Sequence, residues 1–304
     1  MKQLGVLVPI VTPCSRSGKV DLAGFKNVCR DMLDNGCDHI FVAGSTGRGP
    51  WFSRADRAKI CRAAVDLVGG KSLIFAGCMA SGLSEMLENT KAMADAGANI
   101  AVLTAPGYFN YSYKEIEIIF REFADRSPLP VLIYDIPVFA GVKLDMDMVM
   151  RLSRHPNVIG FKDSSGDAER FRKMASVFRK LPDFYLLQGK EHLLMDSLRS
   201  GASGFVVSLI HVYPGLFVAL SQALRSGKTE KAEHIQKEIV RVMQLCEKSF
   251  QRRPETSTLF HFINFALRGR KTCDNILLEH EGDCPKWLAA NAAAAVKICA
   301  NALN

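Results

Sequence analysis

Short apolar runs alternate along the chain with longer segments in which apolar residues recur every three or four positions. The longer segments have the period of a helix, and several begin with a residue that often caps helices, such as Asp21, Ser53 or Ser84. The short runs are rich in β-branched residues and predict buried strands. They are Val6 to Ile10, His39 to Ala43, Ser72 to Gly77, Asn99 to Leu103, Val131 to Tyr134, Val158 to Lys162, Phe184 to Gln188 and Gly204 to Ser208.

Eight strand and helix units within about 225 residues match a closed (β/α)8 TIM barrel, a fold of about 250 residues. An open doubly wound sheet is the alternative, but no Gly-x-Gly-x-x-Gly segment follows the first strand, so its usual dinucleotide signal is missing. After Tyr213-Pro214 the strand pattern stops and helical periodicity takes over. We therefore expect an α/β fold, with a barrel domain at residues 1–225 and a helical C-terminal extension at 226–304.

Composition and charge narrow the class of protein. The 304 residues are 48% hydrophobic and 23% charged, which is typical of a globular protein with one large core. No apolar run is long enough to span a membrane. The formal net charge is +8, but the basic residues are spread from Lys2 to Lys297 beside no nucleic-acid motif. A nucleic-acid partner is therefore disfavoured, while attraction of acidic metabolites stays open.

The nine cysteines contain no CxxC pair, and no histidine pair has metal-ligand spacing along a helix, so a structural zinc site is not expected. Their odd number, and the lack of a signal peptide before the run Leu4 to Pro9, indicate a reducing cytoplasm. In that compartment the thiols would act as small apolar side chains.

Polar residues stand where the predicted strands end, and in a barrel of this kind those ends form the working face. A lysine that ends a buried strand is costly to keep charged, and its neutral amine is a nucleophile for carbonyls. Lys162 holds such a place, and a phenol, Tyr134, ends the neighbouring strand. The pair indicates Schiff-base chemistry. The other candidates at strand ends are Ser45, Thr46, Gly47, Arg48, Tyr108, Gly189, Glu191, His192 and Ser208.

Three motifs on these strands together resemble those of the dihydrodipicolinate synthase and N-acetylneuraminate lyase group of pyruvate-dependent class I aldolases. They are Gly44-Ser45-Thr46-Gly47, Tyr134-Asp135-Ile136-Pro137 and Gly160-Phe161-Lys162-Asp163-Ser164-Ser165-Gly166-Asp167. Each motif alone is weak, but their joint occurrence in this order is specific. The resemblance covers the barrel from Leu4 to about Pro214.

The resemblance implies a role for each catalytic residue. Lys162 would attack the ketone carbon of pyruvate, or of a 2-oxo acid that yields pyruvate, and Tyr134 would shuttle protons at the imine. Ser45 and Tyr108 would extend that relay. Tyr108 would come from a neighbouring subunit, which implies a homodimer or, more commonly, a homotetramer. The chemistry needs no metal and no organic cofactor.

The same resemblance suggests substrate contacts. Backbone amides and hydroxyl groups of the turn around Ser45 and Thr46 would hold the substrate carboxylate. The segment Lys190 to His192 is equally consistent with a solvated loop, and Tyr111 or Tyr113 could take the role given to Tyr108. The substrate-binding candidates are Thr46, Gly47, Arg48, Phe139, Gly189, Glu191, His192 and Ser208.

Three departures from the family pattern bear on the substrate. Dihydrodipicolinate synthases usually place an arginine two residues after the proline of the second motif, to grip a substrate carboxylate. This chain has Phe139 there, whose ring cannot make that charge-assisted bond. Arg48 replaces a common glutamate, which suggests an acidic substrate group or a pairing with Glu191. Asp135 replaces the common asparagine, and the sequence offers no physical reason for this change.

We therefore expect a class I lyase or aldolase that cleaves or forms a C–C bond between pyruvate and an aldehyde, acting on a 2-oxo-3-deoxy sugar acid or a related hydroxylated 2-oxo acid. Two alternatives use the same lysine imine: 4-hydroxy-tetrahydrodipicolinate (dihydrodipicolinate) synthase, which condenses pyruvate with aspartate semialdehyde, and a 2-oxo acid dehydratase. A non-catalytic sensor would have little reason to keep Lys162, Tyr134 and Ser45 together.

Overall fold

Eight parallel strands close into a barrel in chain order, with β1 pairing both β2 and β8. The computed structural model describes residues 3–252, 255–278, 282 and 284–303. The strands are β1 (Gly5–Pro9), β2 (His39–Val42), β3 (Ile74–Gly77), β4 (Ile100–Leu103), β5 (Val131–Asp135), β6 (Val158–Asp163), β7 (Tyr185–Gln188) and β8 (Gly204–Phe205). The predicted (β/α)8 barrel is confirmed, and closure of the sheet excludes the doubly wound alternative.

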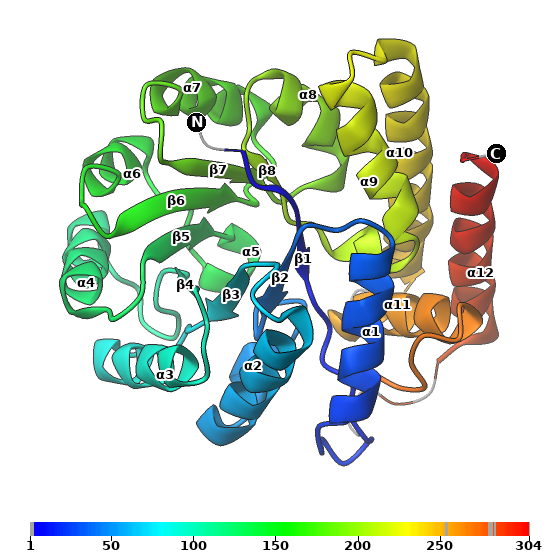
Figure 1. Ribbon diagram of the computed structural model, residues 1–304, viewed down its shortest axis with the longest axis horizontal. Helices are drawn as coiled ribbons and strands as arrows, with labels where there is room; N and C mark the ends of the chain where they lie inside the picture. Colours follow the sequence, from blue (N-terminus) through cyan, green and yellow to red (C-terminus); the bar gives the residue numbers. More distant parts are fainter. Residues whose placement is uncertain (1–2, 253–254, 279–281, 283, 304) are drawn as a thin grey trace. The chain divides into compact units, whose positions relative to one another are not determined.

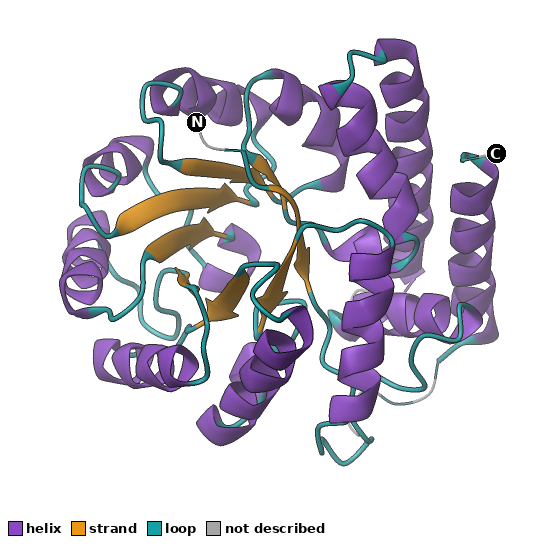
Figure 2. Ribbon diagram, in the orientation of Figure 1, coloured by secondary structure: helices purple, strands orange, loops and turns teal. Residues whose placement is uncertain are grey.

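Contacts within the chain divide it into two compact units, Met1–Ile10 with Asp38–Val206, and Val11–Cys37 with Val207–Asn304. The first unit contains the whole barrel, and helices of that unit lie along the outside of its strands (Figures 1 and 2). These helices are α2 (Arg54–Val68), α3 (Leu83–Asp95), α4 (Tyr113–Arg126), α5 (Pro137–Ala140), α6 (Met146–Leu152), α7 (Ala168–Phe178) and α8 (Leu194–Arg199), with the 3-10 helices η1 (Gly49–Trp51) and η2 (Glu191–Leu193).

The second unit is helical in the residues that the structure describes. It contains α1 (Leu22–Asp34), η3 (Ser208–His211), α9 (Pro214–Arg225), α10 (Thr229–Arg252), α11 (Ser257–Gly269) and α12 (Lys286–Asn301). The helical character expected after the barrel is confirmed, whereas a domain boundary at residues 225 and 226 stays a prediction. No helix among the described residues is long and apolar enough to cross a membrane.

Local sequence explains where the helices begin. The Asp21 carboxylate accepts hydrogen bonds from two amides of the first turn of α1, and the Ser53 hydroxyl accepts one at the start of α2. The expected cap at Ser84 is wrong. Helix α3 begins at Leu83 after Gly82, so Ser84 is already helical and its side chain lies too late in the chain to cap the first amides.

The expected last strand is also too long. Strand β8 ends at Phe205, and Ser208 begins the 3-10 helix η3. The Ser208 carbonyl accepts a hydrogen bond from His211 Nδ1 at 2.9 Å, and the Val212 amide donates to the Leu209 carbonyl. These local bonds use carbonyl groups that a longer strand would offer to a neighbour.

Side chains fill the interior of the barrel, so the centre is a packed core. Phe41, Phe75, Leu132, Tyr134 and Leu187 are among the buried residues of this cluster. Strands covered on both faces read as continuous apolar runs, which is why the strand pattern was visible in the sequence. The aromatic ring of Tyr134 is part of the core as well as of the candidate site.

Candidate active site

Lys162 and Tyr134 lie side by side at the carboxyl ends of β6 and β5. They are register partners in the parallel pair, so their side chains point to the same face of the sheet. The Lys162 Nζ lies 3.8 Å from the centroid of the Tyr134 ring and 5.5 Å from that of Phe41. The two residues are only 4% and 3% exposed. The amine therefore sits against aromatic faces and away from bulk water.

Burial changes the protonation of the lysine. It lowers the pKa of Lys162 from 10.5 to about 7, because the ammonium loses its hydration, while the charge of Glu191 acts in the opposite direction. Near neutral pH a substantial fraction of the amine is unprotonated. That is the form that can attack a carbonyl carbon.

The phenol beside it keeps its proton. Burial raises the pKa of Tyr134 to about 12, although hydrogen bonds with the Ser164 and Ser45 side chains lower it. The predicted partner Ser45 thus contacts Tyr134, and Ser164 joins it. Ser164 was missed in the sequence, although strand alternation places a residue two positions after Lys162 on the same face.

The loop after β2 is folded tightly. Ala43 has a φ of 52°, in the left-handed region that side chains rarely adopt. Its carbonyl oxygen would lie only 1.9 Å from a Cβ placed on Gly49, so the chain can pass there only as glycine. The Gly49 amide donates to the Gly44 carbonyl at 3.1 Å, which closes the loop.

This closed loop carries four of the predicted site residues. Thr46, Gly47 and Arg48 are buried and Ser45 is half-buried. Arg48 also has a φ of 52°, and its amide donates to the Ser45 carbonyl at 3.1 Å. Arg48, for which the sequence suggested an acidic substrate group or Glu191 as partner, is therefore buried, and that role stays a prediction. A rigid turn with fixed amides is what a carboxylate site needs.

The loop after β7 approaches Ser164, the serine that contacts Tyr134. A Cβ on Gly189 would lie 1.9 Å from the Ser164 Oγ, so the glycine makes room for the side chain that contacts Tyr134. Glu191 begins η2, and its charge acts on the pKa of both Lys162 and Tyr134. His192 is exposed. The structure thus gives Gly189 a packing role and places the Glu191 charge near the amine.

Two more of the predicted residues are exposed, and a third belongs to the other compact unit. Tyr108 is 89% exposed, with its ring packed edge-to-face against Phe109 at 4.9 Å. Phe139 is 55% exposed on the short helix α5. Ser208 belongs to the second compact unit. Their proposed roles stay predictions.

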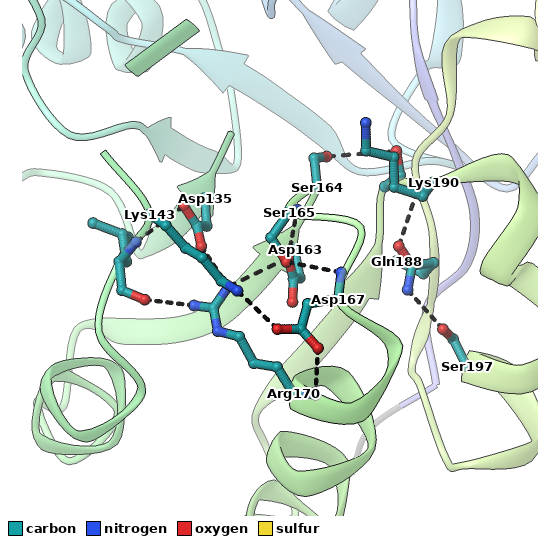
Figure 3. Close-up of polar contacts among 12 residues, drawn as sticks. Asp135, Lys143, Asp163, Ser164, Ser165, Asp167, Arg170, Gln188, Lys190 and Ser197 are labelled. Carbon is teal, nitrogen blue, oxygen red and sulfur yellow. Dashed lines mark hydrogen bonds and ion pairs between the residues drawn. The ribbon is translucent and has the colours of Figure 1, made fainter. Parts of the chain in front are cut away.

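Asp135, which the sequence did not explain, forms a buried ion pair. Its Oδ2 lies 2.6 Å from Arg170 Nη1, and its Oδ1 accepts from the Leu144 amide at 3.3 Å (Figure 3). Burial raises the pKa of Asp135, while Arg170 lowers it. Among the described residues no group of three or more histidine, cysteine, aspartate or glutamate side chains could hold a metal ion.

The chain matches the model of the dihydrodipicolinate synthetase family over residues 2–261. It belongs to this family. The resemblance drawn from the three motifs is confirmed, and the chain is a member of a family of lyases and aldolases.

Relatives of the family support the assignment. The 4-hydroxy-tetrahydrodipicolinate synthase 1 of Streptomyces coelicolor is 32% identical over 238 residues, which cover 78% of this chain and 77% of that protein. YagE, a prophage protein of E. coli K12 from the same family, was solved in complex with pyruvate. It is 25% identical, with a TM-score of 0.88 and 98% of each chain covered.

A more distant structure has the same fold. CdNal from Clostridium difficile, solved in complex with mannosamine, has a TM-score of 0.87 and covers 98% of this chain and 99% of its own. At 18% identity it is evidence for the fold alone.

Proposed function

We propose that the protein is a class I aldolase-type enzyme in which Lys162 forms an imine with pyruvate. The observation that carries the proposal is a buried amine with a pKa lowered to about 7, held 3.8 Å from the ring centroid of a protonated tyrosine. The family relative solved with pyruvate supports the choice of 2-oxo acid.

The neutral Lys162 amine attacks the ketone carbon, so that a C–N bond forms and the carbonyl oxygen takes up a proton. Loss of that oxygen as water needs a second proton. Tyr134 keeps its proton because burial raises its pKa to about 12, so it can donate that proton, and it is left as a phenolate. Ser45 and Ser164, which contact the phenol, would stabilise the phenolate by donating hydrogen bonds to it. The turn around Thr46 would hold the carboxylate of the 2-oxo acid.

The iminium then withdraws electrons from the neighbouring carbon. Loss of a proton there to the Tyr134 phenolate gives an enamine, whose electron pair forms the new C–C bond to an aldehyde carbon. The π electrons of the aldehyde move to its oxygen, which takes up the proton from Tyr134. In the reverse direction the electrons of the broken C–C bond return to the iminium. Water finally releases the product and restores the free amine.

For the aldehyde, the names of the relatives favour the synthase reaction. The matching proteins from Streptomyces coelicolor and Oceanobacillus iheyensis, at 32% and 30% identity, are both named 4-hydroxy-tetrahydrodipicolinate synthases. We therefore place condensation of pyruvate with aspartate semialdehyde first, ahead of the sugar-acid cleavage that the sequence alone favoured.

One observation keeps the sugar-acid reaction as a second candidate. Phe139 stands where the synthases usually have an arginine, and it is 55% exposed on α5. An apolar ring offers no charge-assisted bond to a second carboxylate. A hydroxylated 2-oxo acid, whose aldehyde half carries no such group there, fits this position better.

The imine is tested by incubating the protein with pyruvate and borohydride and locating the reduced adduct by peptide mass spectrometry. We expect a mass gain on the peptide that carries Lys162, and none in Lys162→Met. Folded wild-type protein without an adduct would overturn the proposal.

The aldehyde is tested by two parallel assays on the same preparation. One follows pyruvate consumption with aspartate semialdehyde, and the other follows pyruvate release from a panel of 2-oxo-3-deoxy sugar acids. Appearance of a 2-oxo semialdehyde without pyruvate would instead identify a dehydratase. The substrate with the highest kcat/KM decides between the candidates.

A further inference from the structure

One buried guanidinium links the ends of the two strands that carry Tyr134 and Lys162. Arg170 Nη1 lies 2.6 Å from Asp135 Oδ2 and 3.6 Å from Asp163 Oδ1 (Figure 3). Asp135 follows Tyr134 in β5, Asp163 follows Lys162 in β6, and the two aspartates are themselves register partners. The guanidinium therefore bridges Asp135 and Asp163, the residues that directly follow Tyr134 and Lys162.

The three charges are buried and depend on one another. Arg170, Asp135 and Asp163 are all less than a tenth exposed. Asp163 Oδ1 also accepts from the Ser165 amide at 2.7 Å, but its Oδ2 has no hydrogen-bond partner among the described residues. Two buried carboxylates on paired strand positions repel each other unless a cation separates them. Arg170 supplies that cation.

The second nitrogen of the guanidinium fixes the loop after β5. Arg170 Nη2 donates to the Leu144 carbonyl at 2.7 Å, and the Leu144 amide donates to Asp135 Oδ1 at 3.3 Å. The planar fork of arginine can make both contacts at once, which a lysine ammonium cannot. The loop between α5, which carries Phe139, and α6 is thus tied to the same network.

The network cannot contact a substrate bound at Lys162. Successive residues of a strand point to opposite faces, so Asp135 and Asp163 face away from the side on which Tyr134 and Lys162 lie. Their partner Arg170 comes from helix α7. Any effect on the reaction must pass through the backbone of the two strand ends.

We infer that Arg170 is a positioning residue, which holds Tyr134 and Lys162 in register by clamping Asp135 and Asp163. The inference rests on the proposed function of Lys162 as the imine-forming residue. It also gives the aspartate at position 135 a role, because a carboxylate offers the buried guanidinium an opposite charge, whereas the amide oxygen of the common asparagine offers only a hydrogen bond.

The test compares Arg170→Met with Arg172→Met. Arg172 lies on the same helix and also has its Nη1 2.8 Å from a carboxylate oxygen, that of Asp196, but both side chains are about half exposed, at 51% and 46%. In Arg170→Met we expect the rate of imine trapping with pyruvate to fall by about 10²-fold, since small misplacements of reacting groups cost that much. Arg172→Met should keep the wild-type rate.

A second readout needs no substrate. Labelling of the Lys162 amine with an acylating reagent across pH, followed by peptide mass spectrometry, reports its pKa directly. In Arg170→Met we expect that pKa to rise towards 10.5, because loosened strand ends admit water to the amine. If wild-type protein forms no imine, the proposed function fails, and the labelling curves still decide the role of Arg170.

Two further variants keep the inference open to refutation if Arg170→Met does not fold. Arg170→Lys retains the charge without the fork and should lose less activity than Arg170→Met. The double variant Asp135→Asn with Arg170→Met removes the carboxylate repulsion and should lose less than the sum of the two single losses. A folded Arg170 variant with wild-type trapping and labelling, or strictly additive losses, would overturn the inference.

Discussion

The Lys162 amine lies over the face of the Tyr134 ring, 3.8 Å from its centroid. A cation in this place gains some attraction from the ring, yet the pKa of the lysine still falls to about 7. Loss of hydration therefore outweighs the aromatic attraction. The tyrosine has two effects on the site, since its ring excludes water and its hydroxyl holds a proton.

The rate of imine formation should follow the ionisation of Lys162. Below a pKa of about 7 each unit of pH lowers the neutral fraction about tenfold, so the rate should fall in proportion. Above that pKa the rate should level off. The measurement is the initial rate of formation of the borohydride-trapped adduct from about pH 5.5 to about pH 9, a range that brackets the expected midpoint. A midpoint near the ordinary lysine value would contradict the burial argument.

The same shift makes stability depend on pH. Between a folded pKa of about 7 and an unfolded value of 10.5, the unfolded chain binds a proton that the folded chain lacks. The contribution of Lys162 to the free energy of unfolding should therefore rise with pH across this window, by roughly 5 kcal/mol in all. Lys162→Met should lack this slope and be more stable at neutral pH. Urea unfolding of both proteins at several pH values tests it, and parallel curves would refute it.

Gly189→Ala should impair catalysis by displacing Ser164. The new Cβ would lie 1.9 Å from the Ser164 Oγ, so the hydroxyl must leave the Tyr134 phenol. We expect a loss of about tenfold or more in kcat, in the range of an acid or base group that is misplaced. Combining it with Ser164→Ala, which removes the clashing atom, should add little to the loss of Ser164→Ala alone. If the losses of the two single variants instead add in the double variant, Gly189 would be acting through a direct contact with the substrate.

His211 should make the second unit sensitive to acid. The imidazole is fully buried, with Nδ1 donating to the Ser208 carbonyl and Nε2 accepting from the Val11 amide at 3.3 Å. Burial lowers its pKa from 6.5 to about 4. The contribution of the neutral His211 to the free energy of unfolding is fully present above pH 6.5. It is lost as the pH falls towards 4, by roughly 3 kcal/mol.

The measurement for His211 is unfolding by urea at about pH 7 and about pH 4.5, because these two values cover most of the interval between the unfolded and folded pKa of the imidazole. His211→Gln should be less stable than wild type at neutral pH but should lose less stability on acidification. A variant whose acid loss equals that of wild type would show that other groups control the acid sensitivity.

Tyr108 should act in a neighbouring subunit, as expected from the family resemblance and consistent with its 89% exposed side chain. Tyr108→Phe and Lys162→Met should each be nearly inactive. Unfolded together and refolded as mixed dimers, they should recover about a quarter of wild-type activity, since half of the dimers are mixed and each has one complete site. No recovery in mixed oligomers confirmed by mass would contradict the shared site.

The sequence by itself determined the barrel and the place of its two main candidate site residues. Strand and helix periods are local, so alternation of the two was readable without a structure. A residue at the end of a buried strand in such a barrel must lie on the working face, and this rule put Lys162 and Tyr134 together. The family motifs then supplied the chemistry.

Only the tertiary structure decided which groups tune that site. Ser164, Gly189 and the Asp135 to Arg170 pair depend on contacts between segments that strand register brings together, and the ion pair joins residues 35 positions apart. The lowered pKa of Lys162 depends on how completely the core and its aromatic rings exclude water. A local pattern shows that a lysine ends a strand, whereas its burial and its neighbours are properties of the packed fold.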